Sequence, residues 1–94
     1  MRVVGRERLT EFYGKHADSK DALLAWLYEA EAASWKTPHD LKERYPSASV
    51  LGDGRTVFRI KGNSYRLDSI IAYKTGIVVI ERVGTHAEYD RWAL

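Results

Sequence analysis

Four basic residues, with no acidic residue between them, stand close together in the second half of the chain: Arg55, Arg59, Lys61 and Arg66. Alternate side chains on a strand are about 6.6 Å apart, close to the phosphate spacing of an extended nucleic-acid strand. Arginine can hold a phosphate with two parallel N–H donors, and lysine acts as a point charge. The four are therefore candidate RNA-binding residues, although a solvated sheet face or a charge-protected edge strand gives the same pattern.

Two candidates for proton transfer, His86 and Tyr89, follow in the segment Gly84–Asp90. Cleavage of RNA by transesterification needs a base for the 2′-hydroxyl, an acid for the leaving 5′-oxygen and cations for the charge that develops on phosphorus. His86 and Tyr89 are suited to the first two roles, and Arg66 and Lys61 to the third. The competing interpretation is a C-terminal cap in which His86 and Tyr89 only tie the tail to the rest of the domain.

The elements that must position these residues begin with helices. Apolar residues at helical spacing predict one helix through Leu9–His16 and another through Leu23–Ala30. Asp18 or Ser19 is expected to cap the second helix, and Thr37-Pro38 to open a short third one that ends before Pro46.

After Gly52-Asp53-Gly54, which predicts a turn, the hydrophobic period changes from helical spacing to two. Phe58 and Ile60 should face a core, and the alternate positions Arg55, Arg59 and Lys61 should line the opposite face. Further segments predict a hairpin turn at Gly62-Asn63, a strand over Tyr65–Tyr73, and a strand over Ile77–Ile80 that is buried on both faces and ends by Gly84.

With a first strand over Met1–Val4, the predicted order is β-α-α-α-β-β-β. Because the helices come before the strands of the meander, we expect an α+β fold in which N-terminal helices pack on one face of a small, mainly antiparallel sheet. The chain has 94 residues, of which 45% are hydrophobic and 30% charged, so we expect one folded domain over residues 1–94 rather than a disordered chain.

Composition also limits the function. The absence of cysteine excludes disulfides and thiolate-bound metals and fits the reducing cytoplasm. No apolar run approaches the roughly 20 residues that span a bilayer, so we expect no membrane association. The three histidines lack the spacing of a zinc site and the acidic residues are scattered, so neither a metal nor another cofactor is expected. The formal net charge is only +2, but residues 55–94 carry seven basic residues against four acidic ones.

Two strings, Phe58–Leu67 (FRIKGNSYRL) and Gly84–Asp90 (GTHAEYD), closely resemble HigB toxins of bacterial toxin–antitoxin modules, which belong to the RelE superfamily. The segments Trp35–Leu41 and Arg6–Phe12 are similar too, in the family's order, so the resemblance covers nearly the whole chain.

The resemblance implies a RelE-like fold and a ribosome-dependent mRNA interferase that enters the ribosomal A site and cuts the translated mRNA without a metal. It implies a HigA-like helix-turn-helix antitoxin as partner, and binding of operator DNA through that antitoxin. Carried over, Arg59, Lys61 and Arg66 would hold the scissile phosphate and its neighbours, with His86 and Tyr89 in the catalytic C-terminal stretch.

The final segment holds fewer cations than better-known relatives have, which leaves open whether His86 or Tyr89 is the base. The alternative function is a catalytically weak or inactive RelE-like binding module that acts mainly through its antitoxin and operator DNA.

Overall fold

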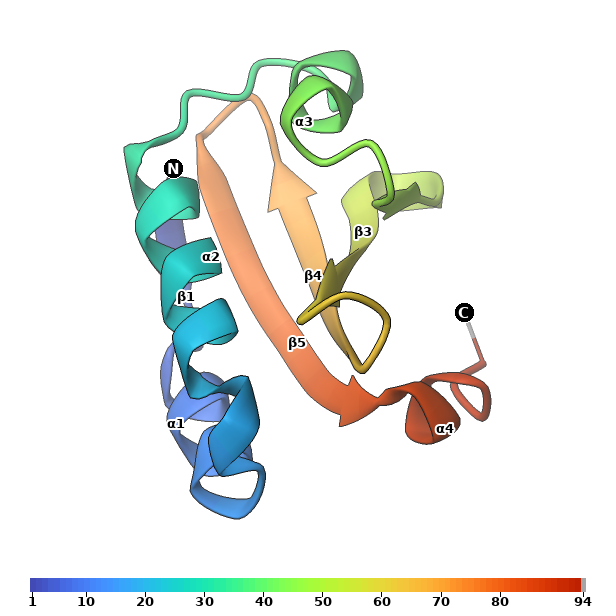
Figure 1. The fold of residues 1–94 in the computed structure, drawn as a ribbon. Coiled ribbons are helices and arrows are strands. Elements are labelled where there is room, and N and C mark those ends of the chain that lie inside the picture. Colours follow the sequence, from blue (N-terminus) through green and yellow to red (C-terminus); the bar gives the residue numbers. More distant parts are fainter. Residues whose placement is uncertain (94) are drawn as a thin grey trace.

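The computed structural model describes residues 1–93, in which helices cover one face of a five-stranded sheet. Figure 1 shows α1 and α2 beside strand β5, with α4 directly after the end of that strand. The elements in chain order are β1 (Arg2–Val4), α1 (Glu7–Lys15), a 3-10 turn (Ala17–Ser19), α2 (Lys20–Ala32), α3 (Pro38–Arg44), β2 (Ser49–Val50), a second 3-10 turn (Gly52–Gly54), β3 (Arg55–Ile60), β4 (Tyr65–Ala72), β5 (Ile77–Thr85) and α4 (His86–Tyr89).

The strands follow the order β1-β5-β4-β3-β2 across the sheet. All neighbouring pairs are antiparallel except β1 and β5, which run parallel with Val3 opposite Val78. The prediction of an α+β fold with a mainly antiparallel sheet is therefore confirmed. The short strand β2 and the helix α4 are additions to the predicted order.

The core lies between the helices and the face of the sheet that carries Phe58. This side chain is fully buried, and the rings of Trp26, Trp35 and Tyr45 surround it at centroid distances of 5.3, 6.2 and 5.2 Å. Ile60 is buried on the same face, whereas Arg59 between them is exposed. The predicted alternation along this strand is confirmed for these three residues, because only one face of β3 meets the helices.

Helix α3 begins as its sequence predicts, since Pro38 is its first residue and the Thr37 hydroxyl accepts from the backbone N–H of Asp40 at 3.2 Å. The expected side-chain cap of α2 is wrong. The Ser19 hydroxyl donates instead to the carbonyl of His16, and the Asp18 carboxylate binds Lys61 in the turn after β3 and Tyr65 of β4. The longest helix, α2, has 13 residues, and none of the described helices combines the length and apolar character needed to cross a membrane.

Strand β5 differs from its prediction in length and in burial. It continues to Thr85, because Gly84 stays in register opposite Arg66. Val78 and Ile80 are buried, but their neighbours are partly exposed. The expectation of burial on both faces is wrong, since the helices cover only one of them. The other face, which carries Arg59, is the open face.

Candidate active site

Four side chains converge at one end of the open face, and we call them the active-site cluster: Arg59, Arg66, His86 and Tyr89. Arg59 and Arg66 stand opposite each other on β3 and β4. His86 and Tyr89 are the first and last residues of α4, so one helical turn brings both side chains toward the strands. Nη2 of Arg66 lies 3.2 Å from Nδ1 of His86, and its guanidinium carbon lies 5.1 Å from the centre of the Tyr89 ring.

Arg66 is a cation that the protein has almost entirely removed from water, with 4% of its surface exposed. Its Nη1 donates to the carbonyls of Asn63 and Tyr65 at 3.0 and 3.2 Å, and its Nη2 donates to Oδ1 of Asn63 at 2.6 Å. Burial, and then the neighbouring Arg59 cation, lower the pKa of Arg66. No carboxylate within residues 1–93 forms an ion pair with it. Arg66 therefore supplies positive charge that no acidic side chain balances directly.

His86 is fixed by its position at the start of α4. Its backbone N–H donates to the carbonyl of Ser64 at 3.0 Å. The preceding residue, Thr85, forms a capping box with Glu88, in which each side chain accepts from the other's backbone N–H. The imidazole remains about half exposed, with Nε2 3.6 Å from the Asp90 carboxylate. The ring is thus held at one nitrogen while remaining open to solvent.

Aromatic packing holds the rest of α4 against β5. Tyr89 makes an edge-to-face contact with Trp92 at 5.6 Å, and the Arg82 guanidinium lies 4.3 Å from the centre of the Trp92 ring. A Cβ at Gly84 would come within 2.6 Å of Trp92, so only glycine allows this close approach. Neither Trp92 nor Gly84 was among the predicted site residues, although Gly84 begins the GTHAEYD string and Trp92 lies two residues after it.

Lys61 lies apart from the cluster, and the expectation that it shares the open face with Arg59 is wrong. Its φ of 53° places it in the hairpin turn, where the strand alternation no longer applies. Its Nζ binds the Asp18 carboxylate at 2.8 Å, and the Tyr65 hydroxyl donates to the same carboxylate at 2.5 Å. Asp18 precedes α2, so this contact turns Lys61 toward the helical side of the sheet.

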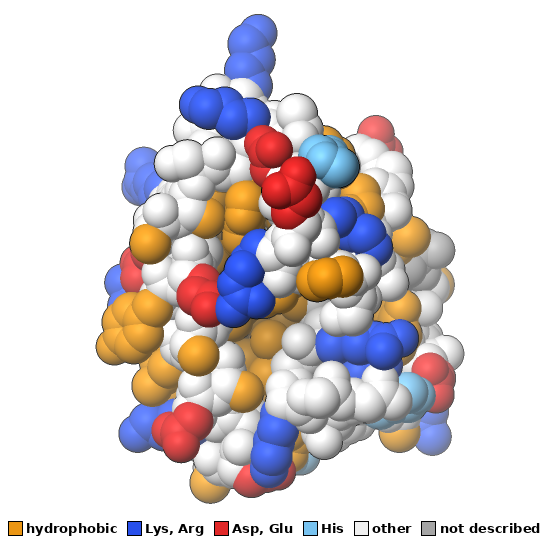
Figure 2. Space-filling view, turned by 45° about the horizontal axis from the view of Figure 1, so that its top comes forward, with side chains coloured by type: hydrophobic (Ala, Val, Ile, Leu, Met, Phe, Trp, Pro, Cys, Tyr) orange, Lys and Arg blue, Asp and Glu red, His pale blue; other side chains and the backbone are white. Residues whose placement is uncertain are grey.

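Arg55 lies on the open face, as predicted, but it is already paired. Its Nη1 binds the buried carboxylate of Asp68 at 2.6 Å, and Nε of Arg82 binds the same oxygen at 3.1 Å. Arg59, by contrast, is exposed and forms no ion pair with any residue of the described range 1–93. In the view of Figure 2, basic side chains are spread over the surface among acidic ones. Among the predicted RNA-binding residues, Arg59 is therefore the exposed cation that forms no ion pair within residues 1–93.

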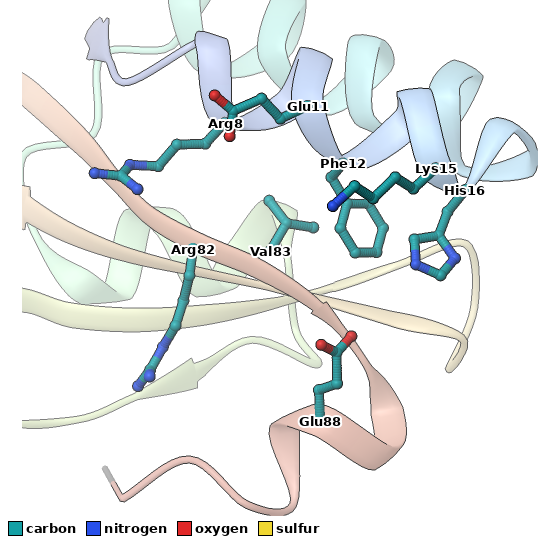
Figure 3. Close-up of a pocket in the computed structure, with 8 residues that line it drawn as sticks. All are labelled: Arg8, Glu11, Phe12, Lys15, His16, Arg82, Val83 and Glu88. Carbon is teal, nitrogen blue, oxygen red and sulfur yellow. The ribbon is translucent and has the colours of Figure 1, made fainter.

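A separate groove of about 270 Å³ opens between α1 and the β5–α4 corner (Figure 3). Lys15 from α1, His16 directly after it and Glu88 from α4 are among its lining residues, and no cluster residue is among them within the described part of the chain. The backbone N–H of Thr85 is the main cause that lowers the pKa of Glu88. His16 stacks on Phe12 at 4.4 Å, so this histidine has a packing contact beside the groove.

Comparisons with known proteins agree on one family. The family model of HigB toxins, described as RelE-like toxic components of a toxin–antitoxin system, matches residues 19–92. The mRNA interferase toxin HigB of Escherichia coli strain K12 is 27% identical over 92 residues, which cover 96% of this chain and 88% of that protein. The proteins named mRNA interferase HigB from Escherichia coli O157:H7 and Shigella flexneri match to the same extent.

Proposed function

The chain belongs to the HigB toxin family of RelE-like toxic components, and from this membership we propose that it is an mRNA interferase, an endoribonuclease that inhibits translation. The relatives named as mRNA interferases support this activity over nearly the whole chain. The single structural observation that carries the proposal is the position of His86 and Tyr89 against the buried cation Arg66.

A phosphodiester fits this arrangement because it brings the negative charge that the cluster lacks. Arg59 is exposed and can contact a phosphate directly, while the buried Arg66 supplies positive charge beneath the surface of the site. The 2′-oxygen attacks phosphorus, the bond from phosphorus to the 5′-oxygen breaks, and a 2′,3′-cyclic phosphate and a 5′-hydroxyl form. One of His86 and Tyr89 removes the 2′-hydroxyl proton, and the other gives a proton to the 5′-oxygen.

This scheme needs no metal ion or cofactor, because the arginine side chains stabilise the charge on phosphorus. Arg55 belongs to the proposed RNA-binding surface at a distance from the reacting atoms, and Lys61 belongs to the same surface. Lys61 also stays in the proposed catalytic set, but it can reach a phosphate only after its ammonium leaves Asp18. Arg55 contributes less than Arg59 because its guanidinium is already held in an ion pair with Asp68.

The proposed partners follow from the family. A toxic component of a toxin–antitoxin system has an antitoxin, and we assign this role to a HigA-like helix-turn-helix protein that also carries the pair to operator DNA. The proposed substrate is mRNA in the ribosomal A site, which places the activity in the cytoplasm.

The test is to add purified protein to a translating bacterial extract and map new 5′ ends on the mRNA. His86→Ala and Arg66→Ala should each lower cleavage at least a hundredfold while circular dichroism and urea unfolding show a folded protein. The matched control is His39→Ala, since His39 is an exposed histidine of α3 whose only ion-pair partner in the described residues is Glu43. Full cleavage by folded His86→Ala and Arg66→Ala proteins would contradict the site assignment.

The second candidate function is the binding module that acts through antitoxin and operator DNA. The low net charge of +2 favours it, because such a protein attracts RNA weakly over long range. Induced expression in a bacterial host separates the two. An interferase arrests growth and fragments mRNA, whereas a binding module does neither.

A further inference from the structure

Arg82 of β5 is a cation that belongs neither to the predicted site residues nor to the active-site cluster. It stands opposite Asp68 of β4, two positions before Gly84, which stands opposite Arg66. Residues two positions apart on a strand point to the same face and lie about 6.6 Å from each other. Figure 3 shows the Arg82 side chain extending from β5 away from α1. Arg82 therefore lies on the open face, one step along the sheet from the buried arginine of the cluster.

The ion pair with Asp68 leaves part of this charge unbalanced. Nη1 of Arg55 and Nε of Arg82 contact the same oxygen, Oδ2 of Asp68, at 2.6 and 3.1 Å. One carboxylate carries one negative charge, so two arginines and one aspartate together keep a net positive charge. Arg82 makes the longer contact, and 42% of its side chain is exposed, against 29% for Arg55. The excess positive charge is therefore most accessible at Arg82.

Two contacts orient the Arg82 guanidinium. The fully buried Asp68 accepts from its Nε, and its carbon lies 4.3 Å from the centre of the Trp92 ring, which in turn contacts Tyr89 of the cluster. Neither Nη1 nor Nη2 of Arg82 forms a hydrogen bond within residues 1–93. The pair of amino groups that can hold a phosphate thus stays free on a side chain that is already oriented, which lowers the entropy cost of binding.

We propose that Arg82 binds the RNA phosphate next to the scissile one, so that the open face holds two neighbouring phosphates of one strand. This inference rests on the proposed function and adds a second phosphate site beside the active-site cluster. The step of about 6.6 Å from Arg66 to the Arg82 row of the sheet is close to the phosphate spacing of an extended strand. Arg59 and Arg66 meet the scissile phosphate, and the Nη groups of Arg82 donate to the non-bridging oxygens of its neighbour. A contact of this kind holds the RNA backbone and does not read its sequence.

The first experiment measures RNA binding without cleavage. The probe is a short single-stranded RNA in which every 2′-hydroxyl is methylated, so that transesterification cannot occur, and fluorescence anisotropy follows binding at several salt concentrations. Arg82→Gln should weaken binding and lower the slope of log affinity against log salt by about 0.7, the value for one lost contact with a single-strand phosphate. Arg82→Lys keeps a cation at this position and should retain most of the wild-type slope.

Arg8→Gln is the matched control for the loss of charge. Arg8 is an exposed arginine of α1, on the helical side of the sheet, and it forms no ion pair within residues 1–93. Its substitution removes the same formal charge and should change the slope much less. Urea unfolding verifies that each variant is folded. An unchanged slope in folded Arg82→Gln, or an equal fall in Arg8→Gln, would overturn the proposal.

The second experiment keeps the native arginine. Protein labelled with 5-fluorotryptophan gives one ¹⁹F signal for each of its three tryptophans, and the Trp92 signal is identified by its loss in Trp92→Phe. The RNA probe should shift the Trp92 signal, because a phosphate bound by Arg82 changes the charge beside the ring. The signals of Trp26 and Trp35, which are buried in the core, should hardly move. A Trp92 signal that stays in place at saturating RNA would overturn the proposal.

The two experiments separate the second phosphate site from the proposed function. If wild-type protein cleaves mRNA in the extract but Arg82→Gln binds the probe with the wild-type slope, the phosphate site fails and the function stands. If wild-type protein cleaves no mRNA, the proposed function fails, and the slope still decides whether Arg82 contacts RNA.

Discussion

At the scale of single residues, ion pairs decide which cations of the open face are available. Arg55, Arg59 and Arg66 were predicted as one RNA-binding set, and all three do lie on that face. Asp68 balances Arg55, whereas Arg59 has no such partner within residues 1–93. The ion pair with Asp68, which lies 13 positions further along the chain, therefore distinguishes Arg55 from Arg59, although both follow the same alternating pattern in the sequence.

Because only Arg55 is held in an ion pair, replacing Arg55 or Arg59 with glutamine should affect RNA binding differently. Arg59→Gln should weaken binding and reduce the slope of log affinity against log salt by about 0.7, the value for one lost contact with a single-strand phosphate. Arg55→Gln should change the slope less, because the Arg55 guanidinium is already engaged in an ion pair with Asp68. Fluorescence anisotropy with a short single-stranded RNA at several salt concentrations measures both. Equal changes in the two variants would argue against the pairing as the deciding factor.

Residue types and spacing predicted the convergence of Arg59, Arg66, His86 and Tyr89, but they misplaced Lys61 and missed Asn63. Both residues lie in the hairpin turn, where the left-handed backbone at Lys61 stops the alternation of side chains. Period-two reasoning holds within a strand and fails at its end. Contacts that form across a closed turn, such as that of Asn63 with Arg66, leave no periodic signal in the sequence.

At the scale of elements, the shortest helix positions the proposed chemistry. Helix α4 has four residues, too few to be stable alone, so its cap and its packing on β5 must hold it in place. The Thr85–Glu88 capping box supplies the cap, and Trp92 packed on Gly84 supplies the contact. The motif string GTHAEYD therefore contains the end of the strand, the cap and both residues proposed for proton transfer.

Removing the Thr85 cap of α4 should lower mRNA cleavage by more than the loss of folding stability explains. Thr85→Ala should cost about 1 kcal/mol in helix stability and reduce cleavage severalfold, because His86 is no longer held at the start of α4. Thr37→Ala is the matched control, since it removes the equivalent cap of α3. Urea unfolding should show a similar loss for both variants, and cleavage per folded molecule should fall only for Thr85→Ala. Equal cleavage by the two would mean that the cap of α4 has no catalytic importance.

Sequence patterns predict the start of a helix correctly where the contacts that cap it are local. Thr37-Pro38 marked the start of α3 correctly, because the cap is local and needs no distant partner. The cap predicted for α2 was wrong because Lys61 and Tyr65, more than 40 positions away, occupy Asp18. The two-residue strand β2 has too little sequence to show any period.

At the scale of the whole molecule, one contact joins the helical layer to the hairpin of the proposed site. Asp18 lies before α2, and it binds Lys61 in the turn and Tyr65 at the start of β4. The hydrogen bonds from Lys61 and then Tyr65 hold the pKa of Asp18 below its ordinary value of 3.8. The contact therefore stabilises the fold only while Asp18 is ionised.

Stability of the whole protein should accordingly depend on pH through Asp18. Because the folded-state pKa is lowered, the contribution is complete well above pH 3.8 and is lost as the pH falls through the folded-state value. Asp18→Asn should lower the urea midpoint slightly at pH 7, and its difference from wild type should shrink below pH 3.8. Asp53→Asn is a control, because exposed Asp53 makes no side-chain hydrogen bond within residues 1–93. A difference for Asp18→Asn that does not change with pH would contradict this linkage.

The parallel pairing of β1 with β5 joins two segments that are made at very different times. Val3 leaves the ribosome long before its partner Val78, and the sheet cannot gain its outer strand until that partner emerges. Until then β1 has no strand beside it, and His86 has not yet been added. The edge of the sheet formed by β1 and the proposed active-site cluster can therefore assemble only after most of the polypeptide has been synthesised.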